Sequence, residues 1–186
     1  MQDHLLQSKY RGSTSGGSPV LPSRMPPVEQ ARRQFDQRSA ELRPELWSYA
    51  RRMLGNAADA DDALQEALVR GWRSVRSGRV PENDRSWLFT ILHHEVLRVL
   101  GRRQGLGRLL AKMRATFRED RSDAPPDSVG ARIAALPFPM SAVILLRFTY
   151  DFSYPEISEI LDLPGGTVRA SASRGLEKLR KELVKP

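Results

Sequence analysis

Residues 153–183 constrain the fold more than any other part of the sequence, because they contain the signals for two helices and for the turn between them. Ser153 and Glu156 have the spacing of a capping box, in which each side chain accepts a hydrogen bond from the backbone N–H of the other. The short helix that begins there ends at the turn 162–166, which reads Asp-Leu-Pro-Gly-Gly, and Thr167 starts the next helix. Two helices joined by a glycine-containing turn predict a helix-turn-helix, a unit that places its second helix in the major groove of DNA.

The second of these helices is predicted to have one apolar and one basic face. Residues 166–186 contain six Lys and Arg but two Asp and Glu, so the exposed face can meet phosphate groups. A three-helix bundle with a solvated basic surface is the alternative, and the order of capping box, turn and basic face favours DNA binding over it. The apolar positions follow a helical period and are expected to pack inward: Val168, Ala172, Leu176, Leu179 and Leu183.

The N-terminal part of the chain divides into a tail and a helical unit. Residues 1–28 contain twelve Gly, Ser or Pro and show no helical period, so they are interpreted as a disordered tail. Residues 29–104 contain three amphipathic helical patterns with short connections, which predict a compact bundle. The first helix is expected to stop at the Gly-Asn pair 55–56, the second to start with Asp59 as its N-cap, and the third to cover 85–103.

A connector separates this bundle from the helix-turn-helix unit. Residues 105–128 carry glycines, a Pro-Pro pair and many basic residues, and are predicted to be a flexible linker. Residues 129–186 form the second unit, and no segment reads as a β-strand. The predicted fold is therefore all-α, with two small helical domains joined by a flexible linker.

Charge and composition exclude several classes of protein. The 186 residues carry 30 Lys and Arg against 22 Asp and Glu, a net charge of +8 that indicates an anionic partner, with nucleic acid ahead of a membrane surface. No apolar run exceeds the five residues 142–146, too few to cross a bilayer, and the first residues lack the pattern of a signal peptide. With no Cys, a disulfide framework is excluded. We therefore expect a soluble, cytoplasmic protein without direct membrane insertion.

No motif of the sequence supports catalysis. His94 and Glu95 begin like a zinc-protease motif, but Arg98 stands where the second His ligand is required. The chain has three His, no glycine-rich phosphate loop after a strand and no nucleophile elbow. We expect no catalytic residue, metal, cofactor or small-molecule substrate. The adjacent His93 and His94 either titrate near neutral pH or, as the simpler interpretation, form part of a polar helix face.

Motifs in both halves follow the order of one known family. The matching segments of the first half are 49–56, 59–68, Trp72, 87–91 and 102–103, and those of the second half are 136–137, 145–147, 153–161 and 163–169. The first set resembles region 2, and the second set region 4, of the extracytoplasmic-function (ECF) sigma factors of the sigma-70 family. The resemblance implies a dissociable specificity subunit that binds bacterial RNA polymerase core and directs promoter-specific transcription initiation, with an anti-sigma factor as a further partner.

The resemblance also implies three sets of binding residues. An acidic helix of region 2 binds core polymerase, here through Asp61, Asp62, Gln65 and Glu66. The loop before the third helix and that helix itself read the −10 promoter element, here through Asn83, Asp84, Arg85, Ser86, His94, Arg98 and Arg102. The second helix of the helix-turn-helix reads the −35 element, here through Thr167, Arg169, Ser171, Ser173, Arg174 and Lys178.

For some of the residues in these segments, a structural role is the alternative to a binding role. N-capping and the helix dipole explain Asp59 and Asp62, but they do not explain acidic or amide side chains beyond the first turn of the helix. Trp87 and Phe89 either stack on bases or pack in the core of the bundle, and core packing is favoured.

The chain departs from the family pattern in both regions. His93 and His94 stand where an Arg-Asn pair is usual, and Arg98 replaces a common Asp. The usual run Ser-Arg-Leu-His-Arg is Ala-Ser-Ala-Ser-Arg at 170–174, which removes one long cation and a His. An alternative is a sigma-like protein that occupies an anti-sigma factor without starting transcription, and the acidic patch argues against it. A simple helix-turn-helix regulator would need a sensor or dimerisation domain, and residues 35–105 resemble neither.

Overall fold

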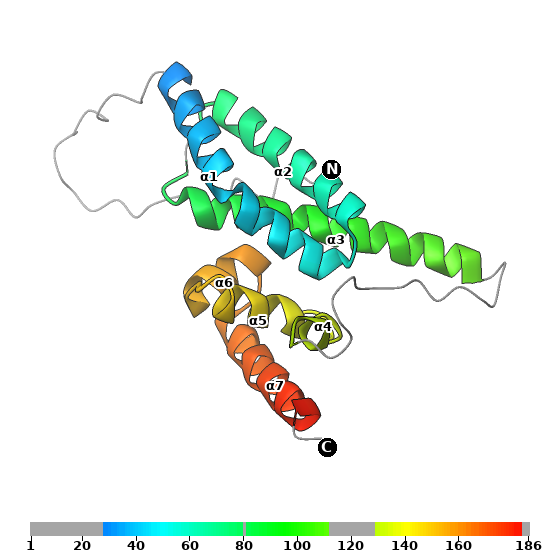
Figure 1. Cartoon of the computed structure of the whole chain (residues 1–186). Coiled ribbons are helices and arrows are strands. Elements are labelled where there is room, and N and C mark those ends of the chain that lie inside the picture. Colours follow the sequence, from blue (N-terminus) through cyan, green and yellow to red (C-terminus); the bar gives the residue numbers. More distant parts are fainter. Residues whose placement is uncertain (1–27, 80, 112–128, 184–186) are drawn as a thin grey trace.

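The computed structural model describes residues 28–79, 81–111 and 129–183, and every regular element in these ranges is a helix. The all-α fold class is thereby confirmed. Figure 1 shows two groups of helices, an N-terminal bundle above a C-terminal unit. The bundle consists of α1 (Val28–Leu54), α2 (Ala57–Arg76) and α3 (Asp84–Ala111), and the C-terminal unit of α4 (Val129–Ala134), α5 (Met140–Phe148), α6 (Tyr154–Leu161) and α7 (Gly165–Leu183).

The turn between α1 and α2 forms as predicted, but with a different cap. Gly55 has a φ of 81°, a left-handed conformation that glycine adopts without strain. Asn56, and not Asp59, is the N-cap of α2, because its Oδ1 accepts the backbone N–H of Asp59 at 2.8 Å. The prediction of Asp59 as the cap was wrong by one helical turn. Both residue types cap helices well, so local preference did not separate them.

Helix α3 is longer than the sequence predicts. It was expected over 85–103 and runs from Asp84 to Ala111, into the segment that was assigned to the linker. Each glycine inside a helix costs about 1 kcal/mol relative to alanine but leaves the backbone hydrogen bonds intact. The glycines at 101, 105 and 107 therefore do not end the helix. Of the predicted tail 1–28, residues 1–27 lie outside the described residues, and Val28 is the first residue of α1. The remainder of the predicted linker, 112–128, also lies outside the described residues.

The C-terminal unit contains the predicted helix-turn-helix in α6 and α7. The capping box is present: the Ser153 N–H donates to Glu156 Oε2 at 2.8 Å, and the Glu156 N–H donates to Ser153 Oγ at 3.4 Å. Helix α6 ends at Asp162, which adopts the left-handed conformation with a φ of 50°. Helix α5 lies beneath both helices of this motif, and its residues 141–146 are all buried.

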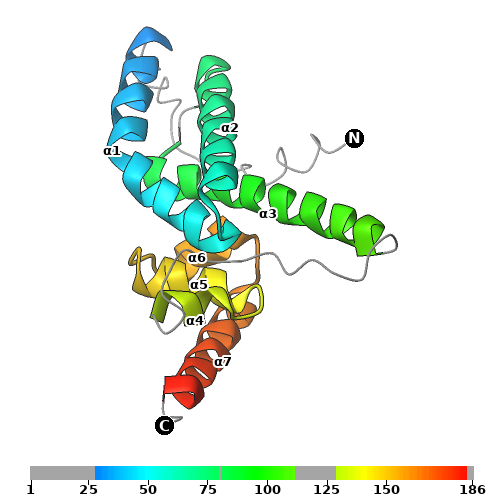
Figure 2. The same ribbon diagram turned by 45° about the vertical axis from the view of Figure 1, so that its right-hand side comes forward.

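The inward face of α7 differs from the prediction at one position. Leu176 was expected in the core and is 44% exposed. Ser171 and Gly175 are buried instead, and a Cβ on Gly175 would lie 3.0 Å from Ile144 of α5. The small residues let α7 approach α5 closely, so they occupy the contact stripe and Leu176 is turned toward solvent. Figure 2 shows α7 extending away from the N-terminal bundle.

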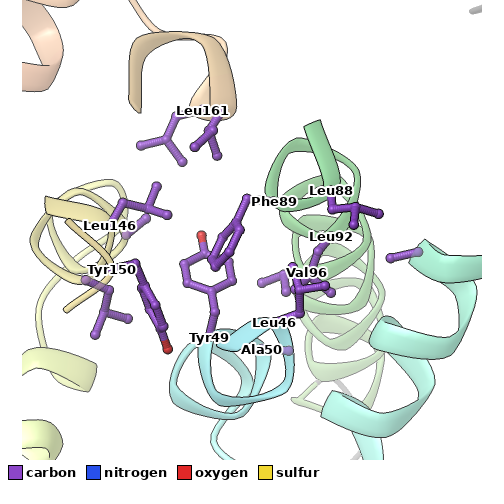
Figure 3. Close-up of a cluster of buried hydrophobic side chains, with 14 of the residues drawn as sticks. Leu46, Tyr49, Ala50, Leu88, Phe89, Leu92, Val96, Leu146, Tyr150 and Leu161 are labelled. Atoms are coloured by element: carbon purple, nitrogen blue, oxygen red, sulfur yellow. The ribbon is translucent and has the colours of Figure 1, made fainter. Parts of the chain in front are cut away.

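The two units meet in an aromatic contact that we call the joint, formed by Tyr49 of α1, Phe89 of α3, and Tyr150 and Phe152 of the segment after α5. The ring centroids lie 5.5 Å apart for Tyr49 and Phe89, and 4.9 Å apart for Phe89 and Phe152. Figure 3 shows Tyr49, Phe89 and Tyr150 facing one another between the helices. Phe89 is fully buried and Trp87 packs edge-on against Phe35 at 6.3 Å, which confirms core packing for both.

Candidate functional site

The predicted polymerase-binding residues lie together on α2. Asp61, Asp62 and Gln65 are exposed and Glu66 is half-buried. Asp61 accepts a hydrogen bond of 2.7 Å from Trp47 Nε1, which fixes its carboxylate against α1, and Glu66 lies 3.4 Å from Arg70 of its own helix. The spacing of three and four residues places these side chains on neighbouring turns of one helix. The structure therefore forms a continuous acidic and amide surface on α2.

The start of α3 uses several predicted −10 residues for its own structure. Asn83 Oδ1 accepts the backbone N–H of Ser86 at 3.1 Å and so caps the helix, while Asn83 Nδ2 lies 3.5 Å from Glu156 of the capping box on α6. The side chain of Ser86 is only 7% exposed. Ser86 therefore faces the core and is removed from the set of residues that can read a base. Asp84 lies 3.8 Å from Arg38 on the surface.

Arg85 connects the N-terminal bundle to the C-terminal unit. Its Nε donates to Glu45 Oε2 at 3.0 Å, and its Nη2 donates to the backbone carbonyl of Tyr150 at 2.7 Å. The guanidinium carbon lies 4.3 Å from the ring centroid of Phe152 and 5.7 Å from that of Phe89. In this arrangement Arg85 is part of the joint, and its guanidinium is held by Glu45 and by the Tyr150 carbonyl.

His93 lies in the core and not on a polar face as predicted. Its Nδ1 is 2.7 Å from Tyr49 Oη, and its ring stacks on Phe138, with centroids 5.7 Å apart and planes 16° apart. Burial, with a smaller effect of the neighbouring His94, lowers the pKa of His93 to about 3, so the ring is neutral at physiological pH. In this chain, the position where the family usually has an Arg is therefore occupied by a core residue. His94 is exposed, as a DNA-binding residue requires.

Glu95 is a feature that sequence reasoning missed. Its side chain is 1% exposed, and its carboxylate faces two arginines on the neighbouring turns of α2 and α3. Arg98 Nε donates to Glu95 Oε2 at 2.7 Å, and Arg70 Nε lies 2.7 Å from Oε1 as an ion pair without hydrogen-bond geometry. The sequence signal for this pair is the three-residue spacing from Glu95 to Arg98, which places the two side chains on one face of a helix. From the sequence alone, Glu95 is interpreted only as part of a zinc motif.

Two more arginines follow along α3 and have different environments. Arg102 is exposed, as predicted for a phosphate contact. Arg103 donates from Nη1 to the backbone carbonyl of Leu54 at 2.8 Å and from Nη2 to the carboxylate of Asp59. Arg103 therefore closes the turn between α1 and α2, and it also draws Asp59 away from the acidic surface.

Five of the six predicted −35 residues lie on the exposed surface of α7. Ser171 is the exception, because it is 2% exposed and packs toward α5. Burial removes Ser171 from the residues that can reach a base edge. Arg174 donates from Nε to the carbonyl of Ala170 at 3.2 Å, which orients its guanidinium along the helix. The exposed residues of the set are Thr167, Arg169, Ser173, Arg174 and Lys178.

Among residues 28–79, 81–111 and 129–183, no group of three or more His, Asp or Glu side chains is placed to hold a metal ion. Within the same ranges, no helix has both the length and the apolar character needed to span a bilayer.

Two sequence families match this chain, and each covers one of the two units. Residues 39–105 match Sigma-70 region 2, and residues 127–179 match Sigma-70, region 4. The chain is 29% identical over 154 residues to the ECF RNA polymerase sigma factor SigW of Bacillus subtilis, covering 74% of this chain and 82% of SigW. It is 32% identical over 150 residues to the ECF RNA polymerase sigma factor SigE of Mycolicibacterium smegmatis, covering 75% of this chain and 58% of SigE.

Solved structures with the same fold include two complexes with other proteins. The sigma factor RpoE of Bartonella quintana, in complex with the anti-sigma factor NepR, matches with a TM-score of 0.69 and 24% identity over 83% of this chain and 99% of RpoE. CnrH, in complex with the cytosolic domain of CnrY, matches with a TM-score of 0.61 and 24% identity over 84% of this chain and 94% of CnrH. At this level of sequence identity, the similarity to these structures shows a shared fold alone.

Proposed function

Since this chain belongs to the ECF group of the sigma-70 family, we propose that it carries out promoter selection through three surfaces: the acidic surface of α2, the exposed residues of α3, and the exposed face of α7. Members of this family are transcription initiation factors and not enzymes. The observation that carries the assignment is the presence, in one chain, of an acidic surface on α2 and a basic recognition helix on α7. A DNA-binding protein of net charge +8 gains no affinity for DNA from an acidic surface, so that surface fits a protein partner.

The polymerase contact is assigned to Asp61, Asp62, Gln65 and Glu66. Three of these side chains are exposed, and none of the four is needed for the N-cap, which Asn56 provides. Asp62 has no ion-pair partner among the described residues, so a basic surface on core polymerase can bind it without first breaking an internal pair. The hydrogen bond from Trp47 orients Asp61 at little entropic cost.

The DNA contacts are assigned to residues that the structure leaves exposed. On α3 these are His94, Arg98 and Arg102, with Asn83 and Asp84 at its start; on α7 they are Thr167, Arg169, Ser173, Arg174 and Lys178. The hydroxyls of Thr167 and Ser173 suit base edges, and the long cations suit phosphates. The run 170–174 keeps Arg174 but has one long cation and one His fewer than the usual run, which is expected to change the preferred −35 sequence and not to abolish duplex binding.

The contact between the two units bears on regulation. In the arrangement described here, Arg85 and Asn83 contact the C-terminal unit, so reading of the −10 element by this loop requires the joint to open. Two proteins of the same fold have been solved with another protein bound, one with the anti-sigma factor NepR and one with the cytosolic domain of CnrY. An anti-sigma factor that binds both units would keep the joint closed, and its release would favour the open arrangement. Such a cycle places the protein in the cytoplasm with the polymerase.

The experiment that tests this function is transcription from genomic DNA fragments by sigma-free core polymerase with the purified chain added. Sequencing of RNA 5′ ends is expected to give discrete new start sites that share two spaced upstream motifs. Asp62→Arg is expected to lower transcription at these sites at least about tenfold, because it reverses a charge at a buried protein contact. Asp36→Arg, at an exposed position of α1, is the matched control and is expected to leave transcription unchanged.

A sigma-like mimic is the second candidate, and the family departures at His93, His94 and Arg98 are the observation that favours it. The departure at His93 does not support the mimic, because this residue lies in the core. If core polymerase and the chain give no new start sites although the chain binds an anti-sigma factor, the mimic is the correct function.

A further inference from the structure

The buried carboxylate of Glu95 holds two surface arginines at the same time. The Glu95 side chain is 1% exposed, whereas Arg98 and Arg70 are 43% and 48% exposed. Each guanidinium therefore contacts the buried Glu95 carboxylate on one side and solvent on the other. A buried carboxylate is costly unless it is paired, so the pairing with both arginines is maintained in the folded chain.

The geometry leaves Arg98 able to bind a ligand. Its Nε and Nη2 both contact Glu95 Oε2, at 2.7 and 2.5 Å. A guanidinium has five N–H donors, so about three remain for another acceptor. Without Glu95, the long side chain of an exposed arginine would sample many rotamers, and ordering it on a ligand would cost conformational entropy.

Arg98 lies in a row with a second cation. Arg102 is four residues further along α3 and is also exposed, which places the two guanidinium groups one helical turn apart. A row of cations along a helix fits the regularly spaced phosphates of a nucleic-acid strand better than the edge of a single base. On this ground the partner of Arg98 is the phosphate backbone.

We propose that Glu95 is a positioning residue, which orients Arg98 for a phosphate of the −10 DNA and at the same time pairs with Arg70 of the polymerase-binding helix α2. The inference rests on the proposed function, because it takes α3 as the DNA-facing helix. Arg70 also contacts Glu66 at 3.4 Å, so a chain of charged contacts runs from the acidic surface through Glu95 to Arg98.

Position 98 is one of the departures from the family pattern. Where the family commonly has an Asp, this chain has Arg98, which pairs with the Glu95 carboxylate one turn earlier on α3. At this position we therefore expect a cation that contacts phosphate.

The test measures binding of the full chain to a labelled single-stranded oligonucleotide of mixed sequence, by fluorescence anisotropy at several salt concentrations. Glu95→Gln increases the net charge by one, so electrostatic attraction alone would tighten binding. Positioning predicts the opposite: affinity about threefold to tenfold lower, and a plot of log K against log salt shallower by about 0.7, the value for one lost phosphate contact on a single strand. Arg98→Ala is expected to give the same two changes, and the double variant to be no weaker than Arg98→Ala alone.

Controls separate positioning from charge and from folding. Arg43→Ala removes one exposed cation of α1 and is expected to leave the salt slope unchanged. Thermal unfolding shows whether the Glu95→Gln chain is folded. If it is not, Arg98→Lys is the second variant, because lysine keeps the positive charge but lacks the planar guanidinium group. Arg98→Lys is expected to lower the affinity for the oligonucleotide in the same way. Equal or tighter binding by Glu95→Gln with an unchanged slope, equal binding by Arg98→Lys, or absence of binding by the wild-type chain would overturn the proposal. Failure of the proposed function would appear separately, as absence of new start sites in the transcription experiment.

Discussion

Replacement of Arg85 by alanine is expected to open the joint between the two units. The half-exposed ion pair with Glu45 contributes about 0.5 kcal/mol. The hydrogen bond from the charged guanidinium to the Tyr150 carbonyl contributes about 2 kcal/mol, and the contact with the Phe152 ring about 0.5–1 kcal/mol. The contacts to Tyr150 and Phe152 cross between units and are lost on opening. Their loss, about 2.5–3 kcal/mol, shifts the equilibrium between closed and open arrangements roughly 100-fold toward the open one.

Energy transfer between two dyes measures this shift directly. The chain has no cysteine, so one introduced cysteine in each unit labels it specifically; Arg43 on α1 and Arg180 on α7 are exposed positions. The Arg85→Ala chain is expected to show lower mean transfer efficiency than the parent. Arg38→Ala is the control, because Arg38 pairs with Glu41 and Asp84 within the N-terminal bundle.

An unchanged transfer efficiency in the Arg85→Ala chain, with Arg38→Ala also unchanged, would show that the contacts of Arg85 do not hold the units together. The reasoning about Arg85 would then be refuted, and the aromatic contacts alone would hold the two units together.

Three further outcomes follow from the packing and the recognition helix. Gly175→Val is expected to destabilise the chain to heat by about 1–3 kcal/mol, because its side chain meets α5, while Gly166→Ala, in open space, is not. The pKa of His93 is about 3 in the folded chain against an ordinary value of 6.5, so the unfolded chain binds more protons between these values. Stability in urea unfolding is then full above pH 6.5 and falls, by up to about 1.4 kcal/mol per pH unit, as the pH drops toward 3; His93→Gln removes this dependence. In binding to duplex DNA of a mapped promoter, Arg174→Ala is expected to lose about tenfold in affinity and Ser171→Ala to lose none.

Local signals predicted the helix-turn-helix well, because its determinants are close in sequence. Ser153 and Glu156 satisfy each other's backbone, and the turn before α7 needs only the residues within it. The inward face of α7 was harder to predict. A hydrophobicity pattern predicts that Leu176 faces inward. Because α5 approaches α7 closely, the small residues Ser171 and Gly175 face inward instead.

Contacts between distant residues could not be predicted from the sequence. Arg85 looks like any cation of a polar loop until the fold places the Tyr150 carbonyl beside it. His93 looks polar until Tyr49 and Phe138 enclose it. Glu95 has the spacing of a surface ion pair, and only the packing of α2 against α3 makes it a buried anion. Each case depends on a partner at least 25 positions away along the chain.

Helix α3 carries Arg85 at the joint and Arg103 at the turn between α1 and α2, on one uninterrupted run of backbone. A helix advances by about 100° per residue, so a single inserted or deleted residue between these two arginines would rotate one of them to another side of the axis. The evolutionary consequence is that this stretch is held to a constant length. Homologous chains should accordingly place their gaps outside it.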